Sequence, residues 1–559
     1  MLVMSNQGKK KEIVYEIYVQ SFQDSNNDGI GDLRGIIQRL DYLQKLGVTM
    51  LWLTPIYQSP MVDNGYDISD YQTINPIYGT IDDFDLLVQK AHRRGIGIMM
   101  DLVVNHTSDK HIWFKKSCQS ANNEYSDFYI WQNPVNGGAP TNLGSVFGGS
   151  AWEYVSSRNQ YYLHLFSKQQ PDLNWRNPNL RNAIYNVMRF WINHGIDGFR
   201  MDSISLISKP KHFINMPLSH GVKYAPYYRG IANGSQLHKY LHEMFDEVLK
   251  GKSILTVGET PHTSIEQAQK YLNHSYPELD MIFQFEHMHC DYGEYGRYSD
   301  VRFKLSDLKK SFNQWQNGLS WNSIYLGNHD QPRIVSRFGD EHIYREKSAK
   351  MLAMATLFQR GTPFIYQGDE LGMTNCNFKS IDDYHDIETR NKYHELIENG
   401  MDKHQALKII QIKSRDNGRT PMQWNDSKYA GFTTHKPWIS VNKNFQKINE
   451  QCEEVDSESV LSFYQELIKL RKNNKILIDG DFEPISVNDS AIFAFMRKLG
   501  KQMIIVICSF VGKKVQYNLP NNFKVENSAK IIGNYALKNS KLKQTMYLEP
   551  YECDAFSID

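Results

Sequence analysis

The sequence predicts an α/β protein built around a (β/α)8 barrel, with a subdomain inserted after the third barrel strand and an antiparallel β domain at the C-terminus. Its 559 residues exceed the needs of one small domain and suit a large barrel with smaller units attached. Short β-rich runs alternate with amphipathic helical patterns over most of the chain, which is typical of a parallel sheet. Beyond about residue 480, short strands broken by Gly, Pro and Asn indicate a separate β domain.

Eight β-rich runs follow one another along the chain, which is the number of strands that closes a (β/α)8 barrel. An amphipathic stretch, such as residues 33–46 or 82–94, separates most of them. In such a barrel the active site lies at the C-terminal ends of the strands. The predicted strands are residues 13–22, 48–56, 96–106, 196–202, 254–259, 281–286, 323–330 and 363–370.

The spacing between these runs is uneven, and the long intervals predict insertions. The third strand is followed by about 70 residues rich in Asn, Ser, Gly, Tyr and Trp, too many for a structureless loop in a compact domain. A second excursion, polar and basic, covers residues 373–438. We therefore expect the barrel over residues 1–106 and 175–479, the inserted subdomain over 107–174 and a C-terminal β-sandwich domain over 480–559.

Composition excludes several classes of partner. The chain has 63 Lys and Arg against 62 Asp and Glu, so we expect no binding to nucleic acid or to a membrane surface. Its six cysteines are scattered without a CxxC pair, which argues against a disulfide scaffold or a zinc site. The N-terminus lacks a signal-peptide pattern, and the longest apolar run, residues 503–511, is far short of the roughly 20 residues that span a membrane. These features predict a cytoplasmic protein, which we expect to be monomeric.

Polar and charged side chains gather at the ends of four predicted strands, which read DLVVNH, GFRMD, VGE and NHD. A lone acidic residue at a strand end is more often a helix cap or a surface charge, and a lone histidine is as often structural. A buried charge is very costly unless it is paired, so charges on four converging strand ends favour a shared catalytic site. The residues are Asp101, Asn105, His106, Arg200, Asp202, Glu259, His329 and Asp330.

Two carboxylates with a cation beside them suit glycoside hydrolysis. One ionised carboxylate attacks the anomeric carbon, while the other, protonated, assists the leaving oxygen and then acts as a base on water. Burial and neighbouring charges push the two pKa values apart. Arg200 and Asp202 lie two residues apart on one strand and share a face, so the guanidinium would keep Asp202 ionised.

The four strand-end motifs resemble, in order and spacing, those of the α-amylase family, glycoside hydrolase family thirteen. QPDLNW at residues 170–175 resembles the additional motif of its oligo-1,6-glucosidase branch. Within the family, the chain resembles oligo-1,6-glucosidases, dextran glucosidases and trehalose-6-phosphate hydrolases. The resemblance covers nearly the whole chain, including DNGYDISDY, IYQGDELGMTN and RTPMQW. It implies a retaining, exo-acting α-glucosidase that hydrolyses isomaltose, isomalto-oligosaccharides, or sucrose and other short α-glucosides.

By this resemblance, three carboxylates would carry the catalysis. Asp202 would be the nucleophile, Glu259 the general acid/base, and Asp330 the third carboxylate, which grips sugar hydroxyls and stabilises the transition state. Further residues would bind the substrate by hydrogen bonding, stacking or packing. They are Tyr66, Asp67, His106, Phe147, Phe166, Arg200, Ser203, His329 and Arg415.

Four of these binding residues would shape the two ends of the pocket. In the family, an Asp of the DNGYD motif and an Arg before RTPMQW hold the O4 hydroxyl of a terminal glucose. The corresponding residues would be Asp67 and Arg415, and they would close the far end of the pocket. Phe147 and Phe166 in the inserted subdomain would flank the aglycone, although either residue could equally be packing.

Oxygen-bearing residues alternate along the loop after the first strand, with glycines that permit tight turns. The pattern resembles the start of an EF-hand loop and suits Ca²⁺ or Mg²⁺. A solvated turn rich in Asp and Asn is the alternative interpretation. Family members carry a metal in the equivalent loop, so the resemblance implies a structural metal, and it implies no organic cofactor. The expected ligands are Asp24, Asn26, Asp28, Ile30 and Asp32.

Three features leave the exact substrate open. Ser203 follows the nucleophile, where oligo-1,6-glucosidases typically carry Val and α-1,4-preferring relatives carry Ala or Thr. Trehalose-6-phosphate hydrolases need basic residues at the mouth, for which Lys209, Lys211 and Lys223 are candidates, although they could equally be solvated. A sucrose-isomerising or transglucosylating enzyme is a further alternative. Residues 331–335 speak against it, since they lack the charged stretch of the isomerising relatives.

Overall fold

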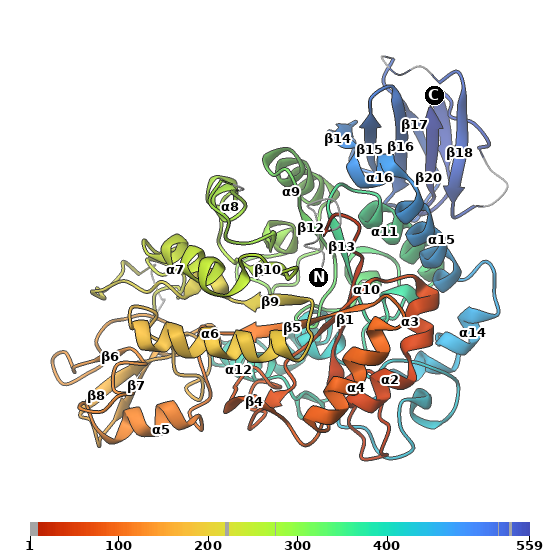
Figure 1. Ribbon diagram of the computed structural model, residues 1–559. Coiled ribbons are helices and arrows are strands. Elements are labelled where there is room, and N and C mark those ends of the chain that lie inside the picture. The colour runs from red at the N-terminus through yellow and green to blue at the C-terminus, as the bar shows by residue number, and fades with distance from the viewer. Residues whose placement is uncertain are drawn as a thin grey trace.

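The computed structural model describes residues 9–558 apart from 219–222, 274, 522, 524 and 536–538, so the first eight residues of the predicted barrel segment lie outside it. At its centre, eight parallel strands form one sheet in the order β11-β10-β9-β5-β2-β1-β13-β12 (Figure 1). The hydroxyl of Ser323 on β12 donates to the carbonyl of Ile282 on β11 over 2.6 Å, which joins the two ends of the sheet into a barrel. The strands are β1 (Val14–Ile17), β2 (Met50–Leu53), β5 (Gly97–Val103), β9 (Gly198–Asp202), β10 (Leu255–Glu259), β11 (Met281–Phe283), β12 (Ser323–Ile324) and β13 (Thr362–Tyr366).

Each of the eight predicted β-rich runs overlaps one barrel strand, which confirms the fold class. Several strands are shorter than the runs that predicted them. The run over 323–330 keeps only β12 as strand, and the amide of Gln331 then closes a turn on the carbonyl of Asn328. The polar ends of the runs therefore leave the sheet and turn into the mouth of the barrel.

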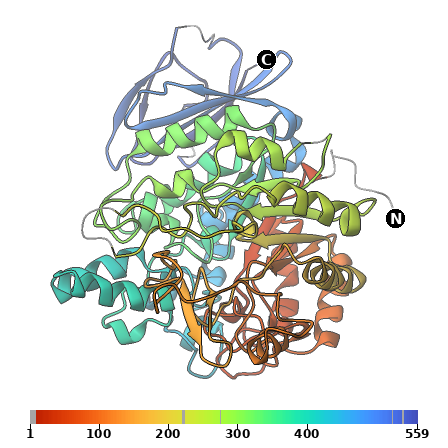
Figure 2. The ribbon, with the colours of Figure 1, turned by 90° about the vertical axis from the view of Figure 1, so that its left-hand side faces the viewer.

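Helices cover the outside of the barrel (Figure 2). α4 (Ile81–His92) begins with a capping box between Thr80 and Asp83, and the predicted helix over 33–46 is divided in two at Arg39. None of the helices in the described part of the chain combines the length and the apolar composition of a membrane span. Other helices around the barrel are α2 (Leu33–Gln38), α3 (Leu40–Leu46), α6 (Pro178–Asn193), α7 (Leu237–Met244), α8 (Ile265–Tyr271), α9 (Leu305–Gly318), α10 (Ile334–Phe338), α11 (Arg345–Leu357) and α15 (Val460–Asn473).

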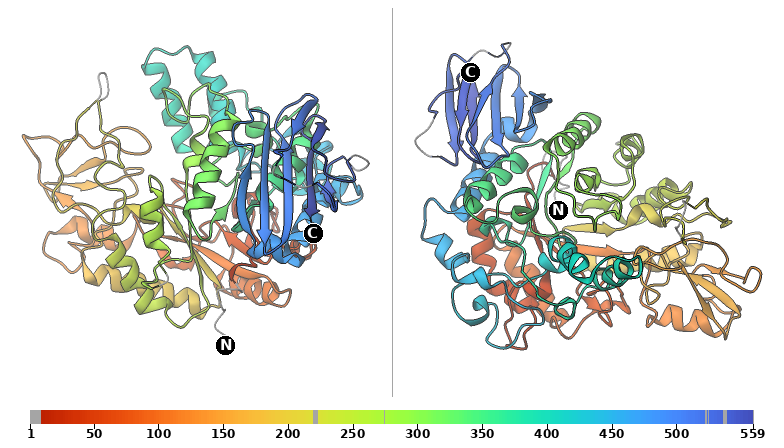
Figure 3. Two further views of the ribbon diagram at one scale, coloured as in Figure 1. Left: turned by 90° about the horizontal axis from the view of Figure 1, so that it is seen from above. Right: turned by 180° about the vertical axis from the view of Figure 1, so that it is seen from behind.

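The insertion after β5 has secondary structure of its own and a small apolar core that also includes Leu206 and Ile231 from the segment after β9. It contains α5 (Ile112–Gln119) and a three-stranded antiparallel sheet, and Trp152 is buried in its core. The excursion after β13 forms a helical hairpin of α12 (Ile387–Glu398) and α13 (Lys403–Lys413). The insertion and the C-terminal domain lie on opposite sides of the barrel (Figure 3). The strands of the insertion are β6 (Trp131–Gln132), β7 (Trp152–Val155) and β8 (Gln160–Leu163).

The C-terminal domain is antiparallel, as predicted, and follows α16 (Lys475–Asp479). A five-stranded sheet in the order β14-β15-β16-β20-β18 faces the β17-β19 pair. Ile505 of the large sheet and Tyr517 and Met546 of the small one share the core between them. The strands are β14 (Asp481–Ile485), β15 (Ile492–Leu499), β16 (Gln502–Ser509), β17 (Val515–Asn518), β18 (Ser528–Gly533), β19 (Thr545–Leu548) and β20 (Cys553–Ile558).

Candidate active site

The ends of the barrel strands bring the three predicted catalytic carboxylates to one mouth. Asp202 is the last residue of β9, and Glu259 is the last residue of the adjacent strand β10. Asp101 lies on β5, the other neighbour of β9, and Asp330 lies in the loop after β12. Because parallel strands end at the same rim of a barrel, residues far apart in the chain meet there.

One guanidinium, that of Arg200 on β9, joins three of these carboxylates. Its Nη1 lies 2.8 Å from Asp202 Oδ1 and 2.9 Å from Asp101 Oδ1, and its Nη2 lies 2.9 Å from Glu259 Oε2. Arg200 is 2% exposed, so water screens these contacts little. The planar fork of the guanidinium therefore holds Asp202 and Glu259 side by side in a fixed orientation.

The two neighbouring carboxyl groups differ in proton affinity. Burial raises the pKa of Glu259 to about 7, although the charge of Arg200 opposes the shift. Burial also raises the pKa of Asp202, to about 6, again against Arg200. Asp202 is therefore the stronger acid, and between these two values it is mainly ionised while Glu259 keeps its proton. That is the protonation state that a nucleophile and a general acid need.

Ser203 contacts the acid/base candidate directly. Its backbone N–H donates to Glu259 Oε2 over 2.8 Å, and its hydroxyl lies 3.3 Å from the same oxygen. The residue has a φ of 44°, in the left-handed region that is uncommon for residues other than glycine. Ser203, which we expect to lie beside the scissile bond, is therefore hydrogen-bonded to Glu259.

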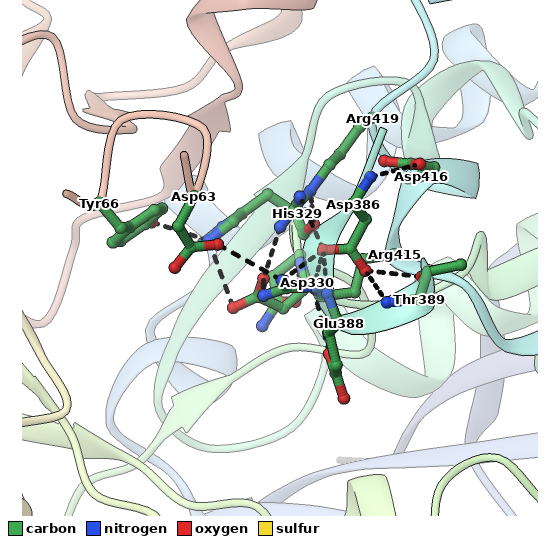
Figure 4. A network of polar contacts seen from close by, with 12 residues as sticks. Asp63, Tyr66, His329, Asp330, Asp386, Glu388, Thr389, Arg415, Asp416 and Arg419 are labelled. Atoms are coloured by element: carbon green, nitrogen blue, oxygen red, sulfur yellow. Dashed lines mark hydrogen bonds and ion pairs between the residues drawn. The ribbon is translucent and has the colours of Figure 1, made fainter. Parts of the chain in front are cut away.

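Asp330 contacts three basic side chains (Figure 4). Its Oδ1 is 3.0 Å from Arg415 Nη1 and 3.0 Å from Arg419 Nη2, and its Oδ2 is 3.3 Å from His329 Nε2. Burial alone would raise the pKa of Asp330, but His329 and the two guanidinium groups outweigh it and hold the pKa well below its usual range. Asp330 is therefore a permanently ionised carboxylate at the mouth.

The structure pairs Arg415 with Asp63 instead of the predicted Asp67. Arg415 Nη2 lies 3.5 Å from Asp63 Oδ1, and the same guanidinium contacts Asp386 (Figure 4). The carboxylate of Asp67 points back into its own loop, where it accepts hydrogen bonds from the amides of Val62 and Asp63 and from the Ser59 hydroxyl. Asp67 therefore braces the loop that presents Asp63, and the first aspartate of DNGYD is the one that faces the site.

The remaining predicted binding residues also converge on the mouth. Tyr66 stacks on His329 with ring centroids 5.3 Å apart. The Phe147 ring lies 5.3 Å from the Arg415 guanidinium carbon and packs edge-on against Phe166. Phe166 in turn lies 5.0 Å from the ring of His106. The inserted subdomain thus supplies aromatic walls to the site.

Four residues of the site were absent from the prediction: Asp63, Asp386, Arg419 and Glu16. Asp63 and Arg419 belong to motifs that the sequence shows, DNGYD and RTPMQW, so a closer reading of those motifs could have found them. Asp386, at the start of α12, and Glu16, on β1, carry no motif signal. Their positions follow from tertiary packing alone.

Lys209, one of the candidate phosphate-binding lysines, is not available to a ligand. It is 6% exposed, its ammonium lies 2.8 Å from Asp172 Oδ2, and it also donates to the side-chain carbonyl of Asn105. The buried ammonium therefore links the loop after β9 to the end of β5 and to the inserted subdomain. Lys211 and Lys223 are exposed.

The candidate metal loop is organised by its own side-chain oxygens. Asp24 Oδ1 accepts the amides of Asn26 and Asn27 over 3.0 and 2.7 Å, and Asp32 Oδ1 caps α2 through the amide of Gly35 over 2.7 Å. Within the residues that the structure describes, no three His, Cys, Asp or Glu side chains are arranged to hold a metal ion. A cation here would also need the side-chain oxygen of Asn26 and a backbone carbonyl oxygen, as at the start of an EF-hand loop. This all-oxygen donor set fits a hard cation.

A (β/α)8 barrel whose mouth holds an arginine-bridged carboxylate pair and a third ionised carboxylate defines a glycoside hydrolase. The sequence profile of the family described as alpha amylase, catalytic domain, matches residues 16–480. The chain belongs to the alpha-amylase family.

Similar proteins span the whole chain. An oligo-1,6-glucosidase of Bacillus cereus is 47% identical over 559 residues, which cover 99% of this chain and 100% of that protein. A trehalose-6-phosphate hydrolase of Bacillus subtilis strain 168 is 45% identical over 98% of both chains. The solved structure of the trehalulose synthase of Pseudomonas mesoacidophila MX-45 matches with a TM-score of 0.94 at 39% identity, covering 98% of this chain and 99% of that one.

Proposed function

We propose that this protein is a retaining, exo-acting α-glucosidase that releases the non-reducing terminal glucose of short α-glucosides, with isomaltose and isomalto-oligosaccharides as its main substrates. One observation carries the proposal: a single guanidinium, that of Arg200, contacts both Asp202 and Glu259. Retaining glycosidases keep their two carboxyl groups about 5–5.5 Å apart, because the nucleophile must itself reach the anomeric carbon. The contact of both carboxyl groups with one guanidinium supports such a close arrangement.

In the proposed reaction, ionised Asp202 attacks the anomeric carbon while Glu259 donates its proton to the leaving glycosidic oxygen. The bond to the aglycone breaks and a β-glucosyl ester forms on Asp202. Glu259, now ionised, then takes a proton from water, whose oxygen displaces Asp202 and releases α-glucose. Asp330, kept ionised by Arg415 and Arg419, stabilises the positive charge that develops on the sugar ring in both steps.

Exo action is supported by the Asp63–Arg415 pair. Both side chains are buried, and Phe147 packs over the guanidinium from the inserted subdomain. A charged pair of this kind can hydrogen-bond the last hydroxyl of a terminal glucose and leaves no passage for a further sugar. Chains would therefore be shortened from one end, one glucose at a time.

A non-phosphorylated substrate is supported by the position of Lys209. Its ammonium is already paired with Asp172, so one of the three lysines that a phosphate site would use is lost. The relatives named oligo-1,6-glucosidase favour the same choice. Trehalose-6-phosphate hydrolysis stays the second candidate, because a protein of that name is 45% identical over 98% of this chain.

A panel of initial rates tests the proposal. We expect kcat/KM to be highest on isomaltose or isomaltotriose among isomaltose, isomaltotriose, maltose, sucrose, trehalose and trehalose 6-phosphate. Glucose should be the only product from the non-reducing end. A preference for trehalose 6-phosphate of tenfold or more would replace the proposed substrate, and isomerisation of sucrose without net hydrolysis would replace the proposed reaction.

We further propose that the loop from Asp24 to Asp32 binds Ca²⁺ or Mg²⁺ in a structural role. The support is its all-oxygen donor set and the turns that its side chains already stabilise.

For the cellular location and the oligomeric state, we propose a cytoplasmic monomer. All six cysteines are free thiols, which suits a reducing compartment, and light scattering on the purified protein measures the oligomeric state.

A further inference from the structure

A buried carboxyl group that the proposed reaction does not use lies beneath the site. Glu16, on β1, is 1% exposed. Its Oε1 lies 2.5 Å from Nδ1 of His329 and 3.3 Å from the backbone nitrogen of the same residue. His329 in turn faces Asp330, so Glu16 contacts the catalytic cluster from behind.

Burial opposes ionisation of both members of this pair, against Arg200 for Glu16 and against Asp330 for His329. Burial raises the pKa of Glu16 well above its ordinary value, and burial lowers the pKa of His329 to about 3. Both shifts favour the neutral forms, a protonated carboxyl group on Glu16 and an uncharged imidazole on His329. The titratable and charged groups that face the pair come from β5, β9, the loop after β12, β13 and residues 415–419. They are Asp101, Arg200, Asp330, Tyr366, Arg415 and Arg419.

Hydrogen bonding on the other side of the ring determines where its single proton lies. The Tyr66 hydroxyl is 2.9 Å from Asp101 Oδ2 and 2.7 Å from His329 Nε2. Its one proton goes to the Asp101 carboxylate, since an ionised acceptor binds a donor more strongly than a neutral one. Nε2 must then be the donor to the Tyr66 oxygen and toward Asp330, which leaves Nδ1 as an acceptor that needs a proton from Glu16.

We propose that Glu16 is a positioning residue, whose carboxyl proton, donated to Nδ1, holds His329 in the tautomer that carries its proton on Nε2. This inference rests on the proposed function, because it assigns Nε2–H to the glucosyl site beside Asp330. Without a donor at Nδ1, the ring proton would be free to move there. A bare Nε2 lone pair would then face the Asp330 carboxylate, and the site would lose a hydrogen-bond donor where charge develops.

Two substitutions separate this role from simple packing. Glu16→Gln keeps a donor, since the amide N–H can reach Nδ1, and should retain kcat/KM within about threefold. Glu16→Met has a similar shape but no donor, and should lower kcat about 100-fold, the effect of removing one donor from a charged transition state. Both variants should melt within a few degrees of the wild type. Loss of activity in Glu16→Gln equal to that in Glu16→Met would overturn the proposal, as would a folded Glu16→Met with near-normal kcat.

The pH profile of Glu16→Gln gives a test that does not depend on Glu16→Met folding. If Glu16 is protonated, replacing it with Gln changes no charge, so both limbs of the kcat/KM profile stay in place. If Glu16 is ionised, the substitution removes a negative charge near Arg200, and both limbs move to lower pH, which contradicts the proposal.

The infrared difference spectrum, wild type minus Glu16→Gln, should also show the carbonyl stretch of a protonated carboxylic acid. A wild type without α-glucosidase activity would refute the proposed function instead, which keeps the two failures distinct.

Discussion

At the scale of single residues, the site depends on an order of proton affinities between two neighbours. Glu259 and Asp202 share one guanidinium, yet burial brings the pKa of Glu259 to about 7 and that of Asp202 only to about 6. Because the two groups interact, the protons leave in macroscopic steps that belong to the pair. The consequence is a narrow range of pH in which one carboxyl is ionised and the other is not.

Activity should therefore follow a narrow bell against pH. As pH falls below about 6, Asp202 gains a proton and can no longer attack, and as pH rises above about 7, Glu259 loses the proton it must donate. Glu259→Gln should abolish the alkaline limb and lower kcat on isomaltose by about 10²–10⁴. Its effect on p-nitrophenyl α-glucoside should be smaller, because that leaving group needs little protonation. An alkaline limb that persists in Glu259→Gln would identify another group as the acid.

Ser203 should help to set the linkage preference, because it lies beside both the nucleophile and Glu259 Oε2. Ser203→Val would present an apolar surface to the extra methylene of an α-1,6 bond, and one methylene is worth about 10–200-fold in discrimination. We expect the isomaltose-to-maltose ratio of kcat/KM to rise about tenfold, at the low end of that range. Both absolute rates should fall, since a β-branched residue is strained at the positive φ of this position.

Ser203→Ala is the matched control for that experiment. It removes the hydroxyl without adding methyl groups, so the ratio should stay within about twofold of the wild type. A ratio that moves by less than twofold in Ser203→Val, or falls, would place linkage selection in the loop after β9 or in the inserted subdomain.

At the scale of elements, the loop between β1 and α2 is where ion binding should affect stability. An ion that binds only the folded protein stabilises it by about 2.7 kcal/mol when its free concentration is 100 times its Kd. EDTA should therefore lower the melting temperature, and Ca²⁺ or Mg²⁺ should restore it. Asp28→Ala, at an exposed position of the loop, should melt like the chelated wild type and ignore both treatments. Equal melting of the wild type with and without EDTA would return the loop to a solvated turn.

The barrel strands and the positions of the two candidate carboxylates at the mouth could be predicted because each depends on a local signal. A short β-rich run predicts its own strand, and the last residue of a parallel strand lies at the mouth whatever the loops do. Asp202 and Glu259 are such residues. Their shared contact with Arg200 follows from two adjacent strands, so little tertiary information was needed.

Loop residues could not be predicted in the same way, since their direction depends on backbone turns and distant partners. Asp63 and Asp67 belong to one loop, and the turn between them passes through Asn64 and Gly65, both at positive φ. That turn decides which aspartate meets Arg415. A lysine in a loop is ordinarily solvated. Lys209 is instead buried, and its ammonium contacts Asp172 and Asn105, which lie far away in the chain.

At the scale of the whole molecule, one arginine connects the C-terminal domain to the barrel. Arg497 on β15 is fully buried and donates to the carbonyl of Phe358, at the end of α11, and to those of Leu477 and Gly480. Carbonyls at a helix end need partners when they are buried. The side chain thus caps a barrel helix from another domain, and the two domains should lose stability together when it is removed.

Arg497→Met should therefore lower the free energy of unfolding by about 3 kcal/mol, because it leaves several buried carbonyls without a donor. Lys498→Met, its exposed neighbour on the same strand, is the matched control and should change stability by less than about 0.5 kcal/mol. Denaturant unfolding of both variants measures the difference. If Arg497→Met matched Lys498→Met, the arginine would not hold the domains together.

In the proposed reaction Asp202 attacks the sugar directly, so that two inversions at the anomeric carbon restore its configuration. Proton NMR of the first glucose released from isomaltose, recorded before the anomers equilibrate, tests this most directly. We expect α-glucose as the initial product, with the β anomer growing in only by mutarotation. Initial release of β-glucose would show that water attacks the substrate itself, and would contradict the assignment of Asp202 as the nucleophile.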